Sequence, residues 1–137
     1  MNLLHNNTLG IDIGSTTVKI AVLDSEQHIL FTDYERHYAN IQETLALLLS
    51  RAKEKLGEMT VSPSITGSGG LTLSGHLNVP FTQEVVAVAT ALQDYAPQTD
   101  VAIELGGEDA KIIYFTGGID QRMNGICAGG TGSFIDQ

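Results

Sequence analysis

The sequence predicts an α/β fold in which an antiparallel meander opens a mixed sheet flanked by helices. Two periodicities predict it. Near the N-terminus apolar residues alternate with a period of two, as in strands with one buried face. Over residues 41–56 they recur every three or four positions, as on an amphipathic helix. The chain has 137 residues, enough for one small domain with a buried core.

The opening meander is predicted from three apolar stretches. Residues 9–13 and 17–23 both have strand character and lie close enough to form a hairpin with a Gly-Ser-Thr tip at 14–16. Residues 24–28 supply the next turn, and residues 29–34 can return as a third antiparallel strand.

The first helix is expected over 41–56, with defined signals at both ends. Asn40 can cap its N-terminus, and Glu43 stands where a capping box has its carboxylate. Gly57 is expected to end the helix, because glycine tolerates the backbone conformation that terminates helices.

The remaining chain is predicted to contain one more helix and several short strands. A strand over 59–66 leads into a glycine-rich stretch at 67–70 that is typical of an ordinary turn. The second helix covers about 83–95 and is stopped by Pro97. Further strands are expected over residues 101–105, 110–115 and 119–122.

Composition and charge narrow the class of protein. The net charge is −9, from 7 Lys plus Arg against 16 Asp plus Glu, and no basic cluster is present. This argues against a nucleic-acid or anionic-membrane partner, since both need clustered positive charge. A single cysteine excludes an internal disulfide and a self-contained iron–sulfur cluster. The N-terminus is too short and polar for a signal peptide, and no apolar run is long enough to span a bilayer. We therefore expect a soluble cytoplasmic protein.

The histidines add no metal-binding signal. The four histidines lack metal-ligand spacing, and His28 and His37 are expected to be solvated.

The first motif that can carry chemistry surrounds the first hairpin tip. The tip offers backbone N–H groups and hydroxyls without bulky side chains, which suits phosphate oxygens. Asp12 is a hard oxygen ligand suited to Mg²⁺, directly or through water, and Lys19 can neutralise phosphate charge. An ordinary glycine turn beside an exposed aspartate explains the motif equally well. The tip residues are Gly14, Ser15, Thr16 and Thr17.

The second motif is the segment Glu104 to Lys111. A strand ends in an acidic residue and is followed by Gly106, Gly107 and two more acidic residues. The three carboxylates can hold Mg²⁺ waters or orient an attacking water. Alone, this segment is better explained as a bulged hairpin with solvated carboxylates, but two such glycine loops in one chain predict a nucleotide held between them. The carboxylates belong to Glu104, Glu108 and Asp109.

The third motif lies near the end of the sequence. The loop of Gly129, Gly130, Thr131 and Gly132 can lead into a helix N-terminus, which attracts anions through its dipole and free N–H groups. Cys127 precedes this loop, so its thiolate would be stabilised if exposed, although a lone cysteine is more often a small buried apolar residue. Because a domain rarely ends on the first turn of a helix, we expect the chain to be the N-terminal part of a longer protein.

Together these motifs resemble the activator ATPases of 2-hydroxyacyl-CoA dehydratases and the related ATPase subunits of benzoyl-CoA reductase, within the acetate kinase, sugar kinase, heat-shock 70 and actin superfamily. GIDIGSTTVK at 10–19 resembles the first phosphate motif of that superfamily, and ELGGEDAK at 104–111 resembles the second. NGICAGGTGSFID at 124–136 resembles the cysteine motif of the activators.

The sequence departs from the family pattern at a few positions. Gly125 and Ile126 replace an acid and a base before the cysteine, and Ser133 replaces an arginine. Glu104 and Glu108 stand where family members often have Asp and Gln.

The resemblance implies a ribonuclease-H-like, actin-like ATPase fold with two duplicated halves that clasp ATP and Mg²⁺, of which residues 1–137 form the N-terminal half. It places Asp12 at the metal, both glycine loops at the phosphates, Glu108 at the attacking water and Cys127 at a [4Fe-4S] cluster that bridges a homodimer. ATP hydrolysis then drives a low-potential electron into a partner dehydratase or reductase that acts on a CoA thioester. Residues 1–137 alone are expected to have little or no ATPase activity.

Two other functions share part of these signals. A sugar or carboxylate kinase of the same superfamily would use both phosphate motifs but gives no reason for Cys127. A nucleotide-switched regulatory or assembly module would use the same motifs as a conformational switch.

Overall fold

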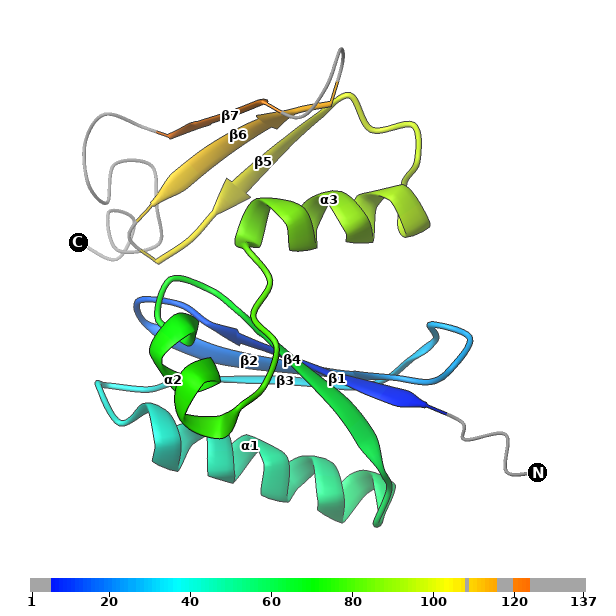
Figure 1. Cartoon of the computed structure of the whole chain (residues 1–137), viewed down its shortest axis with the longest axis vertical. Helices are drawn as coiled ribbons and strands as arrows, with labels where there is room; N and C mark the ends of the chain where they lie inside the picture. Colours follow the sequence, from blue (N-terminus) through cyan, green and yellow to red (C-terminus); the bar gives the residue numbers. More distant parts are fainter. Residues whose placement is uncertain (1–5, 108, 116–119, 124–137) are drawn as a thin grey trace. The chain divides into compact units, whose positions relative to one another are not determined.

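The computed structural model describes residues 6–107, 109–115 and 120–123. The chain divides into two compact units, Met1–Thr82 and Gln83–Gln137, and each unit contains its own sheet (Figure 1).

The first unit combines four strands and two helices. Its sheet has the order β3-β2-β1-β4, in which β1 pairs antiparallel with β2, β2 pairs antiparallel with β3, and β1 pairs parallel with β4. The predicted antiparallel meander and mixed sheet are therefore confirmed. The elements are β1 (Asn7–Ile13), β2 (Thr17–Leu23), β3 (Ile29–Arg36), α1 (Ile41–Leu56), β4 (Val61–Thr66) and α2 (Gly70–Leu77).

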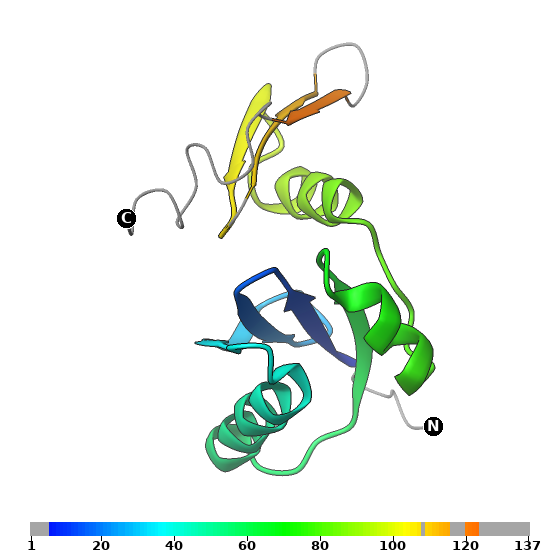
Figure 2. The ribbon, with the colours of Figure 1, turned by 90° about the vertical axis from the view of Figure 1, so that its left-hand side faces the viewer.

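The core of the first unit lies between α1 and one face of this sheet (Figure 2). Alternate residues of the strands point into it, as the period of two predicts. Its buried side chains are Leu9, Ile11 and Ile13 of β1, Val18, Ile20 and Val22 of β2, Ile65 of β4, Leu45, Leu48 and Ala52 of α1, and Leu73 of α2. The residues between them on the strands, including Asp12, therefore lie on the opposite face.

The second unit contains one helix and an antiparallel sheet of order β5-β6-β7. Ile113 is fully buried, Ala89 is nearly so, and the side chain of Lys111 is also buried. The elements are α3 (Glu84–Tyr95), β5 (Val101–Leu105), β6 (Ala110–Tyr114) and β7 (Asp120–Met123).

Two local predictions were wrong. The glycine-rich stretch at 67–70 was predicted to be an ordinary turn, but α2 begins at Gly70 and has eight residues. Asn40 occupies the N-cap position of α1, but its side chain makes no capping hydrogen bond. Its carbonyl instead accepts hydrogen bonds from the N–H and the hydroxyl of Thr44, at 3.0 and 2.7 Å.

The predicted helix end at Gly57 is confirmed, with φ of 77° and its N–H bonded to the Lys53 carbonyl.

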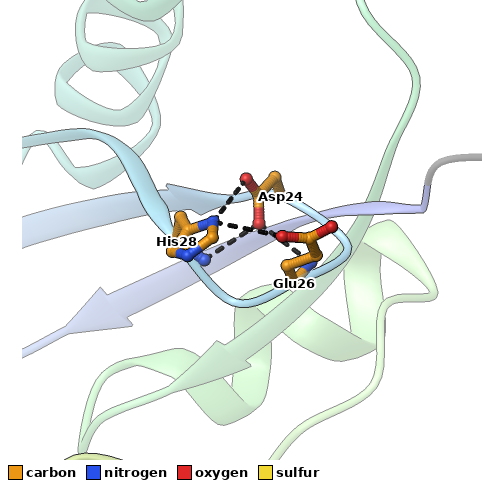
Figure 3. Close-up of polar contacts among 3 residues, drawn as sticks. All are labelled: Asp24, Glu26 and His28. Carbon is orange, nitrogen blue, oxygen red and sulfur yellow. Dashed lines mark hydrogen bonds and ion pairs between the residues drawn. The ribbon is translucent and has the colours of Figure 1, made fainter.

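Asp24 organises the turn between β2 and β3 (Figure 3). Its Oδ1 accepts hydrogen bonds from the N–H groups of Glu26 and His28, both at 2.9 Å, and its Oδ2 lies 3.2 Å from Nδ1 of His28. The backbone hydrogen bond from His28, followed by that from Glu26 and the contact with the His28 side chain, lowers the pKa of Asp24, because each favours the charged carboxylate.

This lowered pKa predicts a pH dependence for the turn. A carboxyl group with a depressed folded pKa stabilises the fold above its unfolded pKa, near 3.8, and loses that contribution as the pH falls through the folded value. We expect the stability difference between the wild type and Asp24→Asn to be constant near neutral pH and to shrink below about pH 4. Urea denaturation from pH 7 to pH 2.5 measures it, with Glu26→Gln as the charge-matched control. A difference that persists unchanged at pH 2.5 would contradict this.

Candidate functional site

The first hairpin has the shape that the first motif predicts. The N–H of Gly14 donates to the Thr17 carbonyl at 2.9 Å and closes the tip between β1 and β2. Ser15 is exposed, and Thr16 and Thr17 are half-buried, in a tight turn that has no large side chain. Such a turn can donate several hydrogen bonds to one anion.

Asp12 and Lys19 lie beside this tip on neighbouring strands. They face each other in the β1–β2 register, and Lys19 Nζ lies 3.7 Å from Asp12 Oδ2. The side chain of Asp12 is 40% exposed, and that of Lys19 is 55% exposed. A solvated pair of this kind contributes little to stability, so an anionic ligand can take Lys19 away from Asp12 at small cost. The structure thus brings together the predicted phosphate-binding and metal-binding side chains of the first motif.

The turn from β4 into α2 also reaches this site, although the sequence analysis assigned it no role. Because β1 and β4 run parallel, their carboxyl ends lie at the same edge of the sheet. The N–H of Gly69 donates to the Ile13 carbonyl at 2.9 Å, which joins this turn to the last residue of β1, directly before the hairpin tip. Gly67 has φ of 98°, and a Cβ there would lie 2.6 Å from Asp12 Oδ1, so the Asp12 carboxylate lies directly against it. The only sequence signal for this contact was the glycine-rich stretch itself.

His37 is the second residue that sequence reasoning missed. It was expected to be solvated, but it is only 7% exposed, and it makes two hydrogen bonds to the hairpin tip. Its backbone N–H donates to the Thr16 carbonyl, and its ring Nε2 donates to the Gly14 carbonyl, both at 3.0 Å. The N–H of Ala39 donates to Nδ1 at 3.0 Å, which fixes the neutral tautomer with its proton on Nε2. His37 therefore ties the tip to the segment before α1.

Two substitutions of His37 can separate these contacts. His37→Gln keeps a donor that reaches the Gly14 carbonyl, whereas His37→Asn keeps an acceptor near Ala39 but cannot reach Gly14. Since a half-buried carbonyl that loses its partner costs about 1–2 kcal/mol, we expect His37→Asn to speed hydrogen exchange of the Gly14 N–H by about 10-fold. In His37→Gln the exchange rate of the Gly14 N–H should stay within about 3-fold of the wild-type rate. His76→Asn, at an exposed position of α2, is the control. Equal exchange in all variants would show that His37 does not hold the tip.

The second motif forms the hairpin between β5 and β6. The N–H of Gly106 donates to the Asp109 carbonyl at 2.8 Å, and Gly107 lies in the bend that follows. Glu104 of β5 faces Lys111 of β6 in the register. Glu108 lies outside the described residues. The roles assigned to Glu104, Glu108 and Asp109, and the binding of phosphate by this loop, stay predictions.

Lys111 forms ion pairs with two carboxylates around this second motif. Its ammonium contacts the Glu84 carboxylate at the start of α3 and lies 3.4 Å from Asp109 Oδ2. The Lys111 side chain is 10% exposed and that of Glu84 is 22% exposed, so their contact is shielded from solvent. In the sequence, Lys111 stood out only as the last residue of the motif. The structure makes it the residue that links the loop to α3.

Several predicted site residues lie outside the described part of the chain. These are Cys127, Gly130, Thr131 and Gly132 of the third motif, together with the helix expected after them. Among the described residues, no group of three or more His, Cys, Asp or Glu side chains is arranged to hold a metal ion. In the same ranges, no helix combines the length and apolar character needed to cross a membrane.

An apolar pocket of about 350 Å³ lies at the other end of the β1–β2 hairpin from its tip. Aliphatic side chains dominate its wall, so it lacks the convergent polar groups that a nucleotide needs. Its lining residues are Leu9, Val22, Leu49, Ala52, Lys53, Leu56, Gly57, Glu58, Met59 and Val61.

The sheet order and the hydroxyl-bearing tip define the first unit as part of an actin-like ATPase fold. Solved structures with this fold match the chain over nearly its whole length. The activator of 2-hydroxyisocaproyl-CoA dehydratase from Clostridium difficile with bound ADPNP gives a TM-score of 0.78 at 26% identity and covers 95% of this chain and 50% of its own. Component A of (R)-2-hydroxyglutaryl-CoA dehydratase from Acidaminococcus fermentans gives 0.75 at 28% identity, with 96% and 52% covered.

The family follows from the sequence match. The chain belongs to the BadF/BadG/BcrA/BcrD ATPase family, whose model matches residues 9–137. Among curated proteins it is 29% identical over 134 residues to the (R)-2-hydroxyglutaryl-CoA dehydratase activating ATPase of Acidaminococcus fermentans, covering 94% of this chain and 51% of that protein. The chain thus spans about half the length of the curated relatives it matches. The predicted family and fold are confirmed.

Proposed function

We propose that this chain binds the phosphate groups and Mg²⁺ of ATP and forms the N-terminal half of an activator of a CoA-thioester dehydratase or reductase. The observation that carries the proposal is the placement of Asp12 and Lys19 beside the hairpin tip, with the tip held by His37. Relatives named as activators of CoA dehydratases, and a solved relative with bound ADPNP, support it.

Each residue of the first hairpin has a defined task in this proposal. The hydroxyls of Ser15, Thr16 and Thr17 and the N–H groups that follow Gly14 donate to phosphate oxygens, and Lys19 adds positive charge. Asp12 receives Mg²⁺ directly or through water; its partly exposed carboxylate fits, because Mg²⁺ keeps several waters and needs only one or two carboxylates besides the phosphates. When bound, Mg²⁺ supplies the charge that offsets the phosphates during hydrolysis.

In the proposal the second loop, which belongs to the second unit, also binds phosphate. Gly106 and Gly107 let its backbone approach a phosphate closely. Glu104 would hold a water of the metal, and Glu108, next to Asp109 in the sequence, would orient the water that attacks the γ-phosphate. Lys111 keeps this loop attached to α3 through Glu84.

The electron-transfer function depends on the third motif. Cys127 would be one ligand of a [4Fe-4S] cluster shared by two identical subunits, and Gly130, Thr131 and Gly132 would couple it to the nucleotide site. When bound, the cluster supplies the low-potential electron that the partner dehydratase or reductase receives. The family match, which extends through Cys127, supports this part of the proposal.

A nucleotide titration tests the first part. In ¹H–¹⁵N NMR spectra, MgATP is expected to shift the amide signals of the tip at 14–17 more than those elsewhere in the first unit. Asp12→Asn should weaken MgATP binding at least about 10-fold, because it removes the negative charge that attracts the metal. Asp94→Asn, on the exposed side of α3, is the charge-matched control. Tip signals that do not respond to millimolar MgATP would contradict nucleotide binding.

Reconstitution with iron and sulfide tests the second part. In a protein that extends this chain to the length of its relatives, the wild type is expected to gain the visible absorbance of a [4Fe-4S] cluster, and Cys127→Ser should lose it. ADP release that depends on an added sugar or carboxylate, without a cluster, would favour the kinase.

A further inference from the structure

The hydroxyl of Thr66, the last residue of β4, has an unusual environment. Its Oγ1 is shielded from solvent and has no hydrogen-bond partner in the described part of the chain. A buried hydroxyl without a partner destabilises a fold, and native structures contain few of them. The position therefore calls for a reason other than stability.

Thr66 lies next to the Asp12 carboxylate. In the parallel register of β1 and β4, Thr66 is the partner of Asp12, and Asp12 is in turn the partner of Lys19 on β2. These three side chains form a row across the sheet at its phosphate-loop edge, on the face opposite the core. Neighbouring strands lie about 4.8 Å apart, so a change of side-chain rotamer can join Thr66 Oγ1 to Asp12.

Asp12 is held near this hydroxyl by the turn that follows β4. Its Oδ1 lies so close to Gly67 that a Cβ there would be 2.6 Å away. Its Oδ2 is 3.7 Å from Lys19 Nζ, in a pair that is too solvated to be strong. A phosphate group that attracts Lys19 would thus leave Asp12 without its cation, beside a donor that has no acceptor.

We propose that Thr66 is a positioning residue for Asp12 in the nucleotide-bound state. Its hydroxyl donates to one carboxylate oxygen when Lys19 turns to the phosphates, and the other oxygen is left to face Mg²⁺ or one of its waters. This inference rests on the proposed function, because it assigns a residue to the same phosphate and metal site.

The test compares three variants of the chain in the absence and presence of MgATP. Thr66→Val removes the hydroxyl but keeps the shape, whereas Thr66→Ser keeps the hydroxyl. Ser64→Ala is the matched control on the same strand and face, where the hydroxyl already lies 3.4 Å from that of Thr82. Tm is measured without nucleotide, and Kd is measured for MgATP and for ATP without metal.

Thr66→Val is expected to raise Tm by about 4 °C without nucleotide, since an unpartnered buried hydroxyl is lost. It should weaken MgATP binding about 10-fold and leave metal-free ATP binding unchanged, because Thr66 acts through Asp12. Thr66→Ser should bind MgATP within about 2-fold of the wild type, and so should Ser64→Ala.

Opposite signs on stability and affinity separate this role from a structural one. A Thr66→Val variant that binds MgATP like the wild type, or that loses Tm together with affinity, would overturn the inference and leave the proposed function intact. A wild type that fails to bind MgATP would overturn the proposed function and this inference with it.

Discussion

Replacing Gly67 with alanine is expected to destabilise the first unit by about 3 kcal/mol and to abolish MgATP binding at the hairpin tip. Two costs add. The φ of 98° is unfavourable for any residue with a Cβ, and that Cβ would collide with the Ile13 carbonyl and lie 2.6 Å from Asp12 Oδ1. The backbone of β1 cannot move away without breaking its pairing with β2 and β4, so the turn must yield. Asp12 would then be displaced from its place beside the tip.

Urea denaturation followed by circular dichroism measures the stability loss, and the NMR titration of the tip amides measures binding. Gly75→Ala is the matched control, because Gly75 lies inside α2 with nothing within 4 Å of its added Cβ. That variant should be stabilised by about 0.5–1 kcal/mol through helix propensity. A Gly67→Ala protein as stable as the wild type would show that the turn is not fixed as described.

Replacing Lys111 with methionine is expected to destabilise the second unit by about 3 kcal/mol. Removing one partner of a shielded ion pair leaves the other charge unpaired, and Glu84 is only 22% exposed. Asp109 would lose the same cation. The loop between β5 and β6 would consequently detach from the start of α3, and we expect its backbone to become more mobile.

Hydrogen exchange of the β6 amides reports this loss within the second unit. Glu84→Met combined with Lys111→Met should recover most of the stability, because an apolar pair replaces both charges. Lys53→Met is the control for removing a lysine, since its pair with Glu58 is exposed and should contribute less than about 1 kcal/mol. A double variant that is no more stable than Lys111→Met alone would refute the role assigned to Glu84.

Elements with a strong local pattern were predictable from the sequence. The bounds of α1, β2 and β5 agree with those predicted, and those of α3 and β6 agree within one residue. In each case the periodicity of apolar residues and the flanking Gly, Pro or polar residues agree. By contrast, α2 has only eight residues, two of them glycine, so its local pattern is too weak to distinguish it from a turn.

The candidate site was predictable only in its local parts. Asp12, Lys19 and the hairpin tip adjoin one another in sequence, so one motif revealed them. His37 contacts a carbonyl 23 residues away, and its burial depends on how β3 returns past the tip. The contacts made by Gly67 depend on the parallel pairing of β4 with β1, which no sequence pattern in either strand reveals.

The parallel pairing of β1 with β4 also determines when the sheet can be completed during protein synthesis. The β1–β2–β3 meander can form soon after it leaves the ribosome, since hairpins form in about 1–10 μs. Asn7 pairs with Val61 and Asp12 with Thr66, but β4 ends thirty residues after the end of β3. At about 5–20 residues per second, the nascent chain spends roughly 2–6 s with one edge of β1 unpaired after the meander has emerged. Through that interval, the strand that carries Asp12 has one edge open to pairing with another chain.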